Sequence, residues 1–123
     1  MMINKEDANI LIVDDIEDNR YTLERRLKRD GYTNIFTADG GKTALEMAAD
    51  NKFDLILLDL MMPDMSGLEV LKYLKGDPMQ RSIPVIMVTA SDEVETAAEC
   101  IINGADDFIT KPFNGTLLKA RVG

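Results

Sequence analysis

The chain has 123 residues, of which 46% are hydrophobic and 29% charged, and its formal net charge is −8. This composition is that of one folded, water-soluble domain spanning residues 1–123, and it excludes a disordered or fibrous chain. Because the sequence has no run of basic residues that could neutralise a row of phosphates, it argues against direct nucleic-acid binding.

Five short apolar runs, rich in β-branched residues, open at Ile10, Ile35, Leu55, Val85 and Phe108, and each is followed by a stretch with helical spacing. The first and third runs are continuously apolar, as expected of strands that are covered on both faces in a parallel sheet. The sequence therefore predicts a three-layer α/β sandwich with helices on both sides of the sheet.

Apolar stripes predict the helices. Ile16, Leu23 and Leu27 mark a first helix over about Asp18 to Asp30, closed by Gly31 in the left-handed conformation. The next three stripes are Leu45, Ala48 and Ala49; then Leu68, Leu71 and Leu74, before Gly76-Asp77-Pro78; then Val94, Ala97, Ala98, Ile101 and Ile102. A fifth helix is expected from Asn114, a good N-cap, to the last residue, Gly123. Because no strong stop signal precedes Gly123, we expect a truncated last helix. This favours a fragment of a longer protein over a stand-alone protein with a clipped last helix, and the alternative stays open.

Residue types missing from the sequence narrow the chemistry. The chain contains no histidine, which excludes Ser/His and Cys/His catalysis, histidine metal sites and a histidine-kinase role. Its single cysteine, Cys100, cannot form an internal disulfide, which favours a reducing, cytoplasmic location. The sequence shows neither a signal peptide nor the ~20 consecutive apolar residues of a membrane span.

Polar residues follow the apolar runs at the ends of four of the five predicted strands: Asp14 and Asp15, Asp59, Thr89, and Lys111. Each alone is compatible with a helix cap, a strand end or a solvated lysine. Together they indicate a site, because ligands in open α/β sheets lie beyond the carboxyl ends of the strands. Asp59 stands among apolar neighbours and therefore needs a cationic partner.

Three carboxylates without an imidazole or thiolate form a hard oxygen site, which suits Mg²⁺, with Mn²⁺ as the alternative. Such an ion would offset the repulsion between the carboxylates and hold phosphoryl oxygens, so that one carboxylate could attack phosphorus in line. Lys111 and Thr89 have the chemistry to bind the remaining oxygens.

At these residues the sequence resembles the receiver domain of two-component response regulators, over essentially the whole chain. The resemblance is carried, in family order and spacing, by four motifs: Ile12-Val13-Asp14-Asp15, Leu58-Asp59-Leu60-Met61-Met62-Pro63-Asp64-Met65-Ser66-Gly67, Val88-Thr89-Ala90, and Gly104-Ala105-Asp106-Asp107-Phe108-Ile109-Thr110-Lys111-Pro112-Phe113.

The resemblance implies a flavodoxin-like, five-stranded parallel sheet in the order 2-1-3-4-5. It also implies that Asp59 accepts a phosphoryl group from a histidine kinase, a histidine phosphotransfer protein or a small phosphodonor. Asp15, Asp59 and the carbonyl of Met61 would bind Mg²⁺ directly, Asp14 mainly through water, and Lys111 would pair with the phosphoryl group. The domain would catalyse only its own phosphorylation and dephosphorylation.

The resemblance further implies a conformational switch. Pro112 would follow a cis peptide that aims the preceding lysine, Thr89 would move toward the phosphoryl group, and Phe108 would turn inward behind it. The output surface would be the fourth helix, fifth strand and fifth helix, and phosphorylation-dependent homodimerisation stays open. Phe108 also fits a plain core position, and Met61 and Met62 fit packing; alternatively, Met61 and Ser91 tune water access to the aspartyl phosphate.

Three alternatives stay open from the residues. A receiver-like module could bind proteins without phosphorylation, although the full acidic set is present. A haloacid-dehalogenase-like phosphatase needs a second aspartate two positions after the nucleophile, where Met61 stands. A flavodoxin-like electron carrier is disfavoured because the acidic segment 14–18 would repel an FMN phosphate.

Overall fold

The computed structural model describes residues 4–90, 94–111 and 115–123. Its strands are β1 (Asn9–Val13), β2 (Asn34–Ala38), β3 (Leu55–Asp59), β4 (Val85–Ala90) and β5 (Asp107–Lys111). Its helices are α1 (Glu17–Arg29), α2 (Gly41–Asp50), α3 (Gly67–Gly76), α4 (Val94–Ile102) and α5 (Gly115–Val122). Strands and helices alternate along the chain, as the apolar runs predict.

The strands form one parallel sheet in the order β2-β1-β3-β4-β5. Ile10 of β1 pairs with Ile35 on one side and with Leu55 on the other, so β1 is central. The expected strand order is therefore confirmed. Since all five strands run the same way, their carboxyl ends meet at one edge of the sheet, which we call the carboxyl edge.

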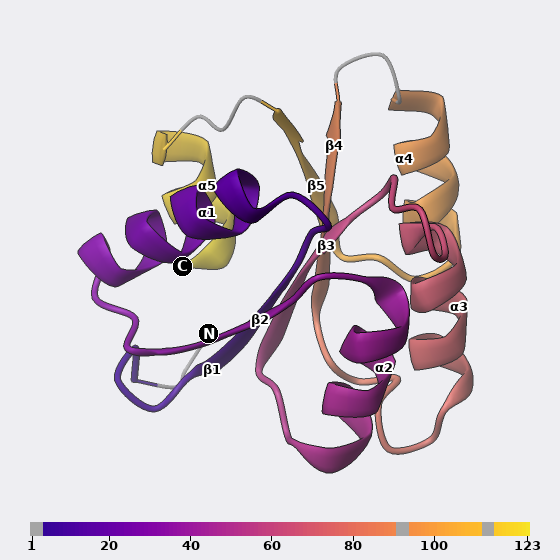
Figure 1. Ribbon diagram of the computed structural model, residues 1–123, viewed down its shortest axis with the longest axis horizontal. Coiled ribbons are helices and arrows are strands. Elements are labelled where there is room, and N and C mark those ends of the chain that lie inside the picture. Colours follow the sequence, from indigo (N-terminus) through magenta and orange to yellow (C-terminus); the bar gives the residue numbers. More distant parts are fainter. Residues whose placement is uncertain (1–3, 91–93, 112–114) are drawn as a thin grey trace.

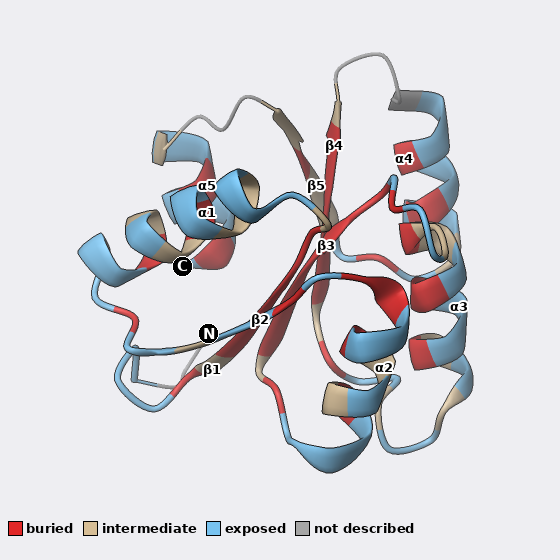
Figure 2. Cartoon of the chain, viewed as in Figure 1, coloured by how far each residue is buried: buried red, intermediate tan, exposed pale blue. Residues whose placement is uncertain are grey.

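Helices cover both faces of the sheet, with α1 and α5 on one face and α2, α3 and α4 on the other (Figure 1). Alternate residues of each central strand point into different cores: Leu11 packs on the α2–α4 side and Ile12 on the α1–α5 side. Both sides of β1, β3 and β4 are consequently buried (Figure 2), which explains their continuously apolar sequences.

Both ends of α1 lie within one residue of the sequence prediction, but one residue of its predicted apolar stripe is not buried. Gly31 has φ 105°, and the N–H of Tyr32 donates to the carbonyl of Leu27 at 3.1 Å, as in a glycine-terminated helix. Ile16, predicted in the buried stripe, is instead 51% exposed, because it precedes the helix with extended backbone and points outward.

Two further stripe predictions are wrong in part. In α2 the buried residues include Ala44 and Ala48, whereas Ala49 is exposed. In α4 the buried residues are Ala97 and Cys100, whereas the apolar residues Ala98, Ile101 and Ile102 are exposed. Residues three apart share a face of a helix, so a small pair such as Ala97 and Cys100 can bury one side while larger apolar residues face outward. The side chain of Val94 lies outside the described residues.

The first turns of α2 and α3 are capped in different ways. Ser66 caps α3, its hydroxyl accepting from the N–H of Glu69 at 3.2 Å. The corresponding residue of α2 is Gly40, which has no side chain, and the carboxylate of Asp64 accepts from the first N–H groups of α2 instead.

None of the described helices has both the length and the apolar character that a bilayer crossing requires.

Candidate functional site

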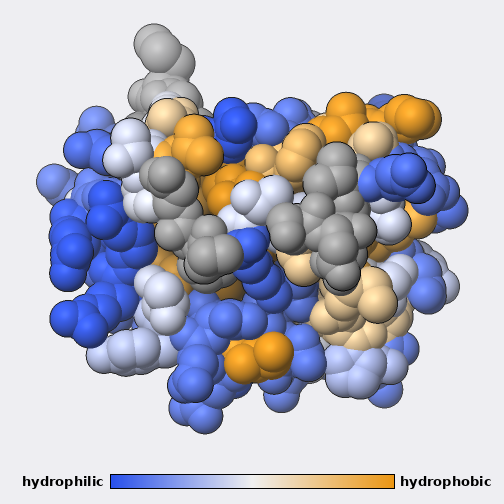
Figure 3. Space-filling view, turned by 90° about the horizontal axis from the view of Figure 1, so that it is seen from above, coloured by the Kyte–Doolittle hydropathy of each residue, from blue (hydrophilic) through white to orange (hydrophobic). Residues whose placement is uncertain are grey.

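Four strands deliver the predicted polar residues to the carboxyl edge. Asp14 and Asp15 follow β1, Asp59 is the last residue of β3, Thr89 lies one residue before the end of β4, and Lys111 ends β5. Figure 3 looks down on this edge, where hydrophilic surface lies among apolar patches. The topology thus brings together residues from four separate segments of the sequence.

Asp59 is 4% exposed and has the cationic partner that its apolar surroundings require. The ammonium of Lys111 donates to its Oδ1 at 3.1 Å. The same ammonium lies 3.3 Å from Oδ2 of Asp14. One lysine therefore stands between two buried carboxylates.

Asp14 is 1% exposed and is held by the first turn of α1. Its Oδ1 accepts from the N–H of Ile16 at 2.9 Å and from the side-chain amide of Asn19 at 3.5 Å. Arg20 donates to its backbone carbonyl at 2.8 Å. The sequence reading missed Asn19 and Arg20, and no sequence signal separates Arg20 from the other arginines of α1.

The three carboxylates form a cluster that fits a divalent cation. One ligand oxygen from each of Asp14, Asp15 and Asp59 lies within 4.8 Å of the others. Oδ2 of Asp14 is buried, and its one cationic neighbour among the described residues is the ammonium of Lys111 at 3.3 Å, which Asp59 shares, so this oxygen could accept a further ligand. An all-oxygen set of this kind matches the preference of Mg²⁺.

Electrostatics in the cluster reflect the crowding of charge. Burial and then the neighbouring Asp14 raise the pKa of Asp59 to about 6, with a smaller contribution from Asp15, while Lys111 acts in the opposite direction. Burial by itself lowers the pKa of Lys111, but the carboxylates of Asp59 and Asp14 outweigh it and raise that pKa. A cation at this place would favour the charged form of Asp59.

Thr89 is buried, and its hydroxyl donates to the carbonyl of Ala90 at 3.1 Å. Phe108 packs against the core on the α2–α4 side but is only half-buried, so its interpretation as a buried core aromatic holds in part. Met62 is 9% exposed, whereas Met61 is 62% exposed, so packing explains the first methionine and not the second. Pro112, with its predicted cis peptide, and Ser91 lie outside the described residues.

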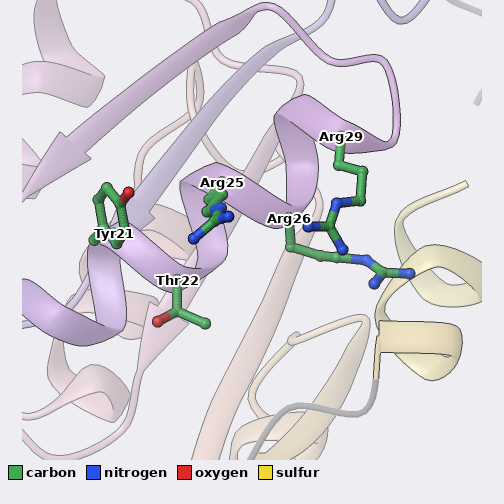
Figure 4. A pocket seen from close by; sticks show the side chains of 5 residues that line it. All are labelled: Tyr21, Thr22, Arg25, Arg26 and Arg29. Carbon is green, nitrogen blue, oxygen red and sulfur yellow. The ribbon is translucent and has the colours of Figure 1, made fainter.

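The molecule also has a hollow of about 300 Å³ on α1, lined by Tyr21, Thr22, Arg25, Arg26 and Arg29 (Figure 4). None of the residues predicted for the site lines it. Arg26 is already engaged there, since its Nε lies 3.5 Å from the carboxylate of Asp30.

Comparison with known proteins identifies the family. Residues 10–123 match the model of the response regulator receiver domain. The chain belongs to the response regulator receiver family. The receiver is 48% identical over 115 residues to the response regulator PleD of Caulobacter vibrioides, covering 94% of this chain and 25% of PleD. It is 37% identical to the chemotaxis protein CheY of Pseudomonas aeruginosa, covering 92% of this chain and 91% of that protein.

Solved structures agree with this family assignment. The crystal structure of the chemotaxis protein CheY4 of Vibrio cholerae superposes with a TM-score of 0.85 at 32% identity, covering 94% of this chain and 95% of that one. Receiver domains are signalling domains of two-component systems that interact with histidine kinases or phosphotransfer proteins and with output domains, and the family binds Mg²⁺ at an acidic cluster.

Proposed function

We propose that this receiver, residues 1–123, accepts a phosphoryl group on Asp59 from a phosphohistidine of a histidine kinase or phosphotransfer protein, in a Mg²⁺-dependent reaction. The observation that carries the proposal is the clustering of Asp14, Asp15 and Asp59 within 4.8 Å, with Lys111 bound to Asp59. The arrangement offers a carboxylate nucleophile, a cation site and a fixed positive charge at one place.

Asp15, Asp59 and the backbone carbonyl of Met61 would hold the metal, with Asp14 acting mainly through water. The bound ion supplies positive charge that offsets the carboxylates and the transferring phosphoryl group. The all-oxygen donor set supports this assignment, as does the crowding of two buried carboxylates around the single ammonium of Lys111.

In the transfer, a carboxylate oxygen of Asp59 forms the new bond to phosphorus while the phosphorus–nitrogen bond of the donor histidine breaks. The electron pair of that bond remains on the imidazole nitrogen of the donor. Lys111, already within 3.1 Å of Asp59, would pair with an oxygen of the transferred group, and the hydroxyl of Thr89 would turn to another.

The output face would consist of α4, β5 and α5. Ile101 and Ile102 of α4 are 39% and 84% exposed, Leu117 of α5 is 45% exposed, and Arg121 of α5 bridges to Asp107 of β5 at 3.1 Å. In the proposed switch, Thr89 moves toward the phosphoryl group and Phe108 turns inward, which biases this face toward a partner or toward a second copy of the chain. We place this signalling role in the cytoplasm, as the unpaired Cys100 favours.

The direct test is incubation with Mg²⁺ and acetyl phosphate, followed by intact-mass measurement and reductive mapping of the acyl phosphate. We expect one phosphoryl adduct on Asp59, none in Asp59→Asn, and a normal adduct in Asp54→Asn. Asp54 is a suitable control because it flanks the other end of β3, where its carboxylate accepts from the N–H of Asn9 at 2.8 Å.

Failure of the folded, metal-loaded wild type to acquire the adduct would favour a receiver-like module that binds partners without phosphorylation. An adduct on a different residue would also contradict the proposal. Of the two buried carboxylates beside Lys111, that of Asp14 already accepts hydrogen bonds from Ile16 and Asn19, which leaves Asp59 as the proposed nucleophile.

A further inference from the structure

The loop between β3 and α3 carries the proposed metal ligand Met61 and is anchored at few points. Its base is closed by the N–H of Gly67, which donates to the carbonyl of Leu60 at 2.7 Å. Met62 is buried, and Met65 packs partly buried against the core. Met61 itself is 62% exposed, so its side chain contributes little to the position of its own carbonyl.

Asp64 ties this loop to a different element. Its Oδ1 accepts from the N–H of Gly41 at 3.2 Å, and its Oδ2 accepts from the N–H of Lys42 at 3.0 Å. Both donors belong to the first turn of α2, whose own N-cap residue, Gly40, lacks a side chain. A carboxylate at a helix N-terminus is stabilised by the helix dipole, and such charge-assisted bonds are stronger than neutral ones.

Two glycines allow this contact. A Cβ at Gly40 would lie 2.9 Å from Oδ2 of Asp64, and a Cβ at Gly41 would lie 2.3 Å from Cγ of Met65. Neither glycine has a positive φ, so steric room and not backbone conformation requires them. The backbone at the start of α2 therefore packs directly against side chains of the β3–α3 loop.

We propose that Asp64 is a positioning residue for the metal site: by binding the first turn of α2, it holds the β3–α3 loop so that the carbonyl of Met61 faces the carboxylate cluster. The metal part of this inference rests on the proposed function. Asp64 lies three residues after Met61. Among the described residues, its two bonds to α2 are the only polar contacts that tie this loop to a neighbouring helix, since the bond between Gly67 and Leu60 only closes the base of the loop.

The positioning role has a readout that needs no metal. In Asp64→Ala, amide hydrogen exchange at Gly41 and Lys42 should accelerate, and backbone amide relaxation by NMR should show greater motion at Met61. Gly40→Ala should act in the same direction with Asp64 intact, because the new methyl group displaces the carboxylate. Unchanged motion at Met61 in Asp64→Ala would overturn the inference, whatever the fate of the phosphorylation proposal.

The second readout is the Mg²⁺ dissociation constant, measured by calorimetry. Removing a group that orients a ligand typically weakens metal binding 10–100-fold, and for Asp64→Ala we expect about tenfold, since one ligand of several is affected. Asp64→Asn keeps one acceptor oxygen and should fall between the wild type and Asp64→Ala.

Two control variants separate positioning from simpler effects. Asp77→Ala removes a carboxylate that accepts a local bond from the N–H of Met79 at 2.7 Å, in the loop after α3 at the opposite edge of the sheet, and controls for a general loss of stability. Asp39→Asn removes one exposed charge just after β2, at the carboxyl edge, and controls for lost electrostatic attraction. Both should bind Mg²⁺ nearly as the wild type does.

A weakening of less than about threefold in Asp64→Ala, or an equal weakening in either control, would overturn the metal part of the inference. If the wild type itself shows neither Mg²⁺ binding nor an adduct on Asp59, the proposed function fails instead. The two failures are therefore distinguishable.

Discussion

The buried carboxylate of Asp59, which the proposed chemistry requires, lowers the stability of the metal-free fold. Its carboxylate is 4% exposed and adjoins a second buried carboxylate, that of Asp14. One ammonium, from Lys111, serves both. The metal-free protein therefore holds uncompensated negative charge at the carboxyl edge, a cost that a bound cation or a changed side chain would relieve.

This cost predicts a pH-dependent stability in the presence of a chelator. Because the pKa of Asp59 is raised to about 6 from 3.8, its contribution to stability is fully present below about 4 and is lost as the pH rises through about 6. The difference between the two protonation states is at most about 3 kcal/mol. In Asp59→Asn that loss should disappear, and at pH 7.5 the variant should melt roughly 5 °C above the wild type.

The measurement is thermal unfolding of both proteins at several pH values without metal. A wild type whose melting temperature rises from pH 4 to pH 6 in parallel with that of Asp59→Asn would contradict the assignment of the slope to this residue.

At the scale of elements, α3 shows how closely a helix approaches the strand before it. Its first residue, Gly67, lies so near the end of β3 that an added Cβ would stand 2.3 Å from the carbonyl oxygen of Asp59 and 2.9 Å from Cα of Leu60. At its last residue, Gly76, an added Cβ would meet no atom within 4 Å from the rest of the described structure, apart from its chain neighbours and its own helix backbone. Glycine is thus required for close packing at the first residue of α3, whereas the surroundings of the last residue leave room for a side chain.

We therefore predict opposite effects for one substitution at the two ends of α3. Gly67→Ala should destabilise the protein by about 3 kcal/mol, because backbone atoms must move apart. Gly76→Ala should stabilise it by about 0.5–1 kcal/mol, because alanine loses less conformational entropy in a helix.

Urea unfolding of the two variants and the wild type tests this pair. Equal effects of the two substitutions would show that Gly67 is not sterically required.

At the scale of the whole molecule, the site exists only in the folded sheet, since its residues come from strands far apart in the sequence. Asp15 and Asp59 are brought together through the pairing of β1 with β3. A ligand that needs this arrangement binds the folded state and not the unfolded chain, so it must stabilise the entire domain by mass action.

Mg²⁺ should accordingly raise the melting temperature of the wild type. At a concentration 100 times the dissociation constant, the gain in unfolding free energy is about 2.7 kcal/mol. Asp15→Ala should gain far less, because it loses a proposed direct ligand. Calorimetric melting with Mg²⁺ and with a chelator compares the two, and an equal response would count against the cation site.

The sequence alone was sufficient for the architecture and for the five polar residues at the carboxyl edge. Continuous apolar runs such as Ile10–Val13 predict strands buried on both faces, and a parallel sheet necessarily collects its strand ends at one edge. Asp14, Asp59, Thr89 and Lys111 follow from this topology without coordinates. The strand order itself came from the family resemblance and is confirmed.

Only the tertiary structure decided which face of each helix is buried and which distant groups meet. The exposed positions of Ile16, Ile101 and Ile102 contradict the predicted stripes, because the packing partner and not hydrophobicity alone selects the buried side. The contact of Asp64 with the start of α2 joins residues 22 and 23 positions apart, and no local pattern encodes it. Local sequence periodicity determines the elements, whereas contacts between elements depend on how their surfaces fit together in the folded molecule.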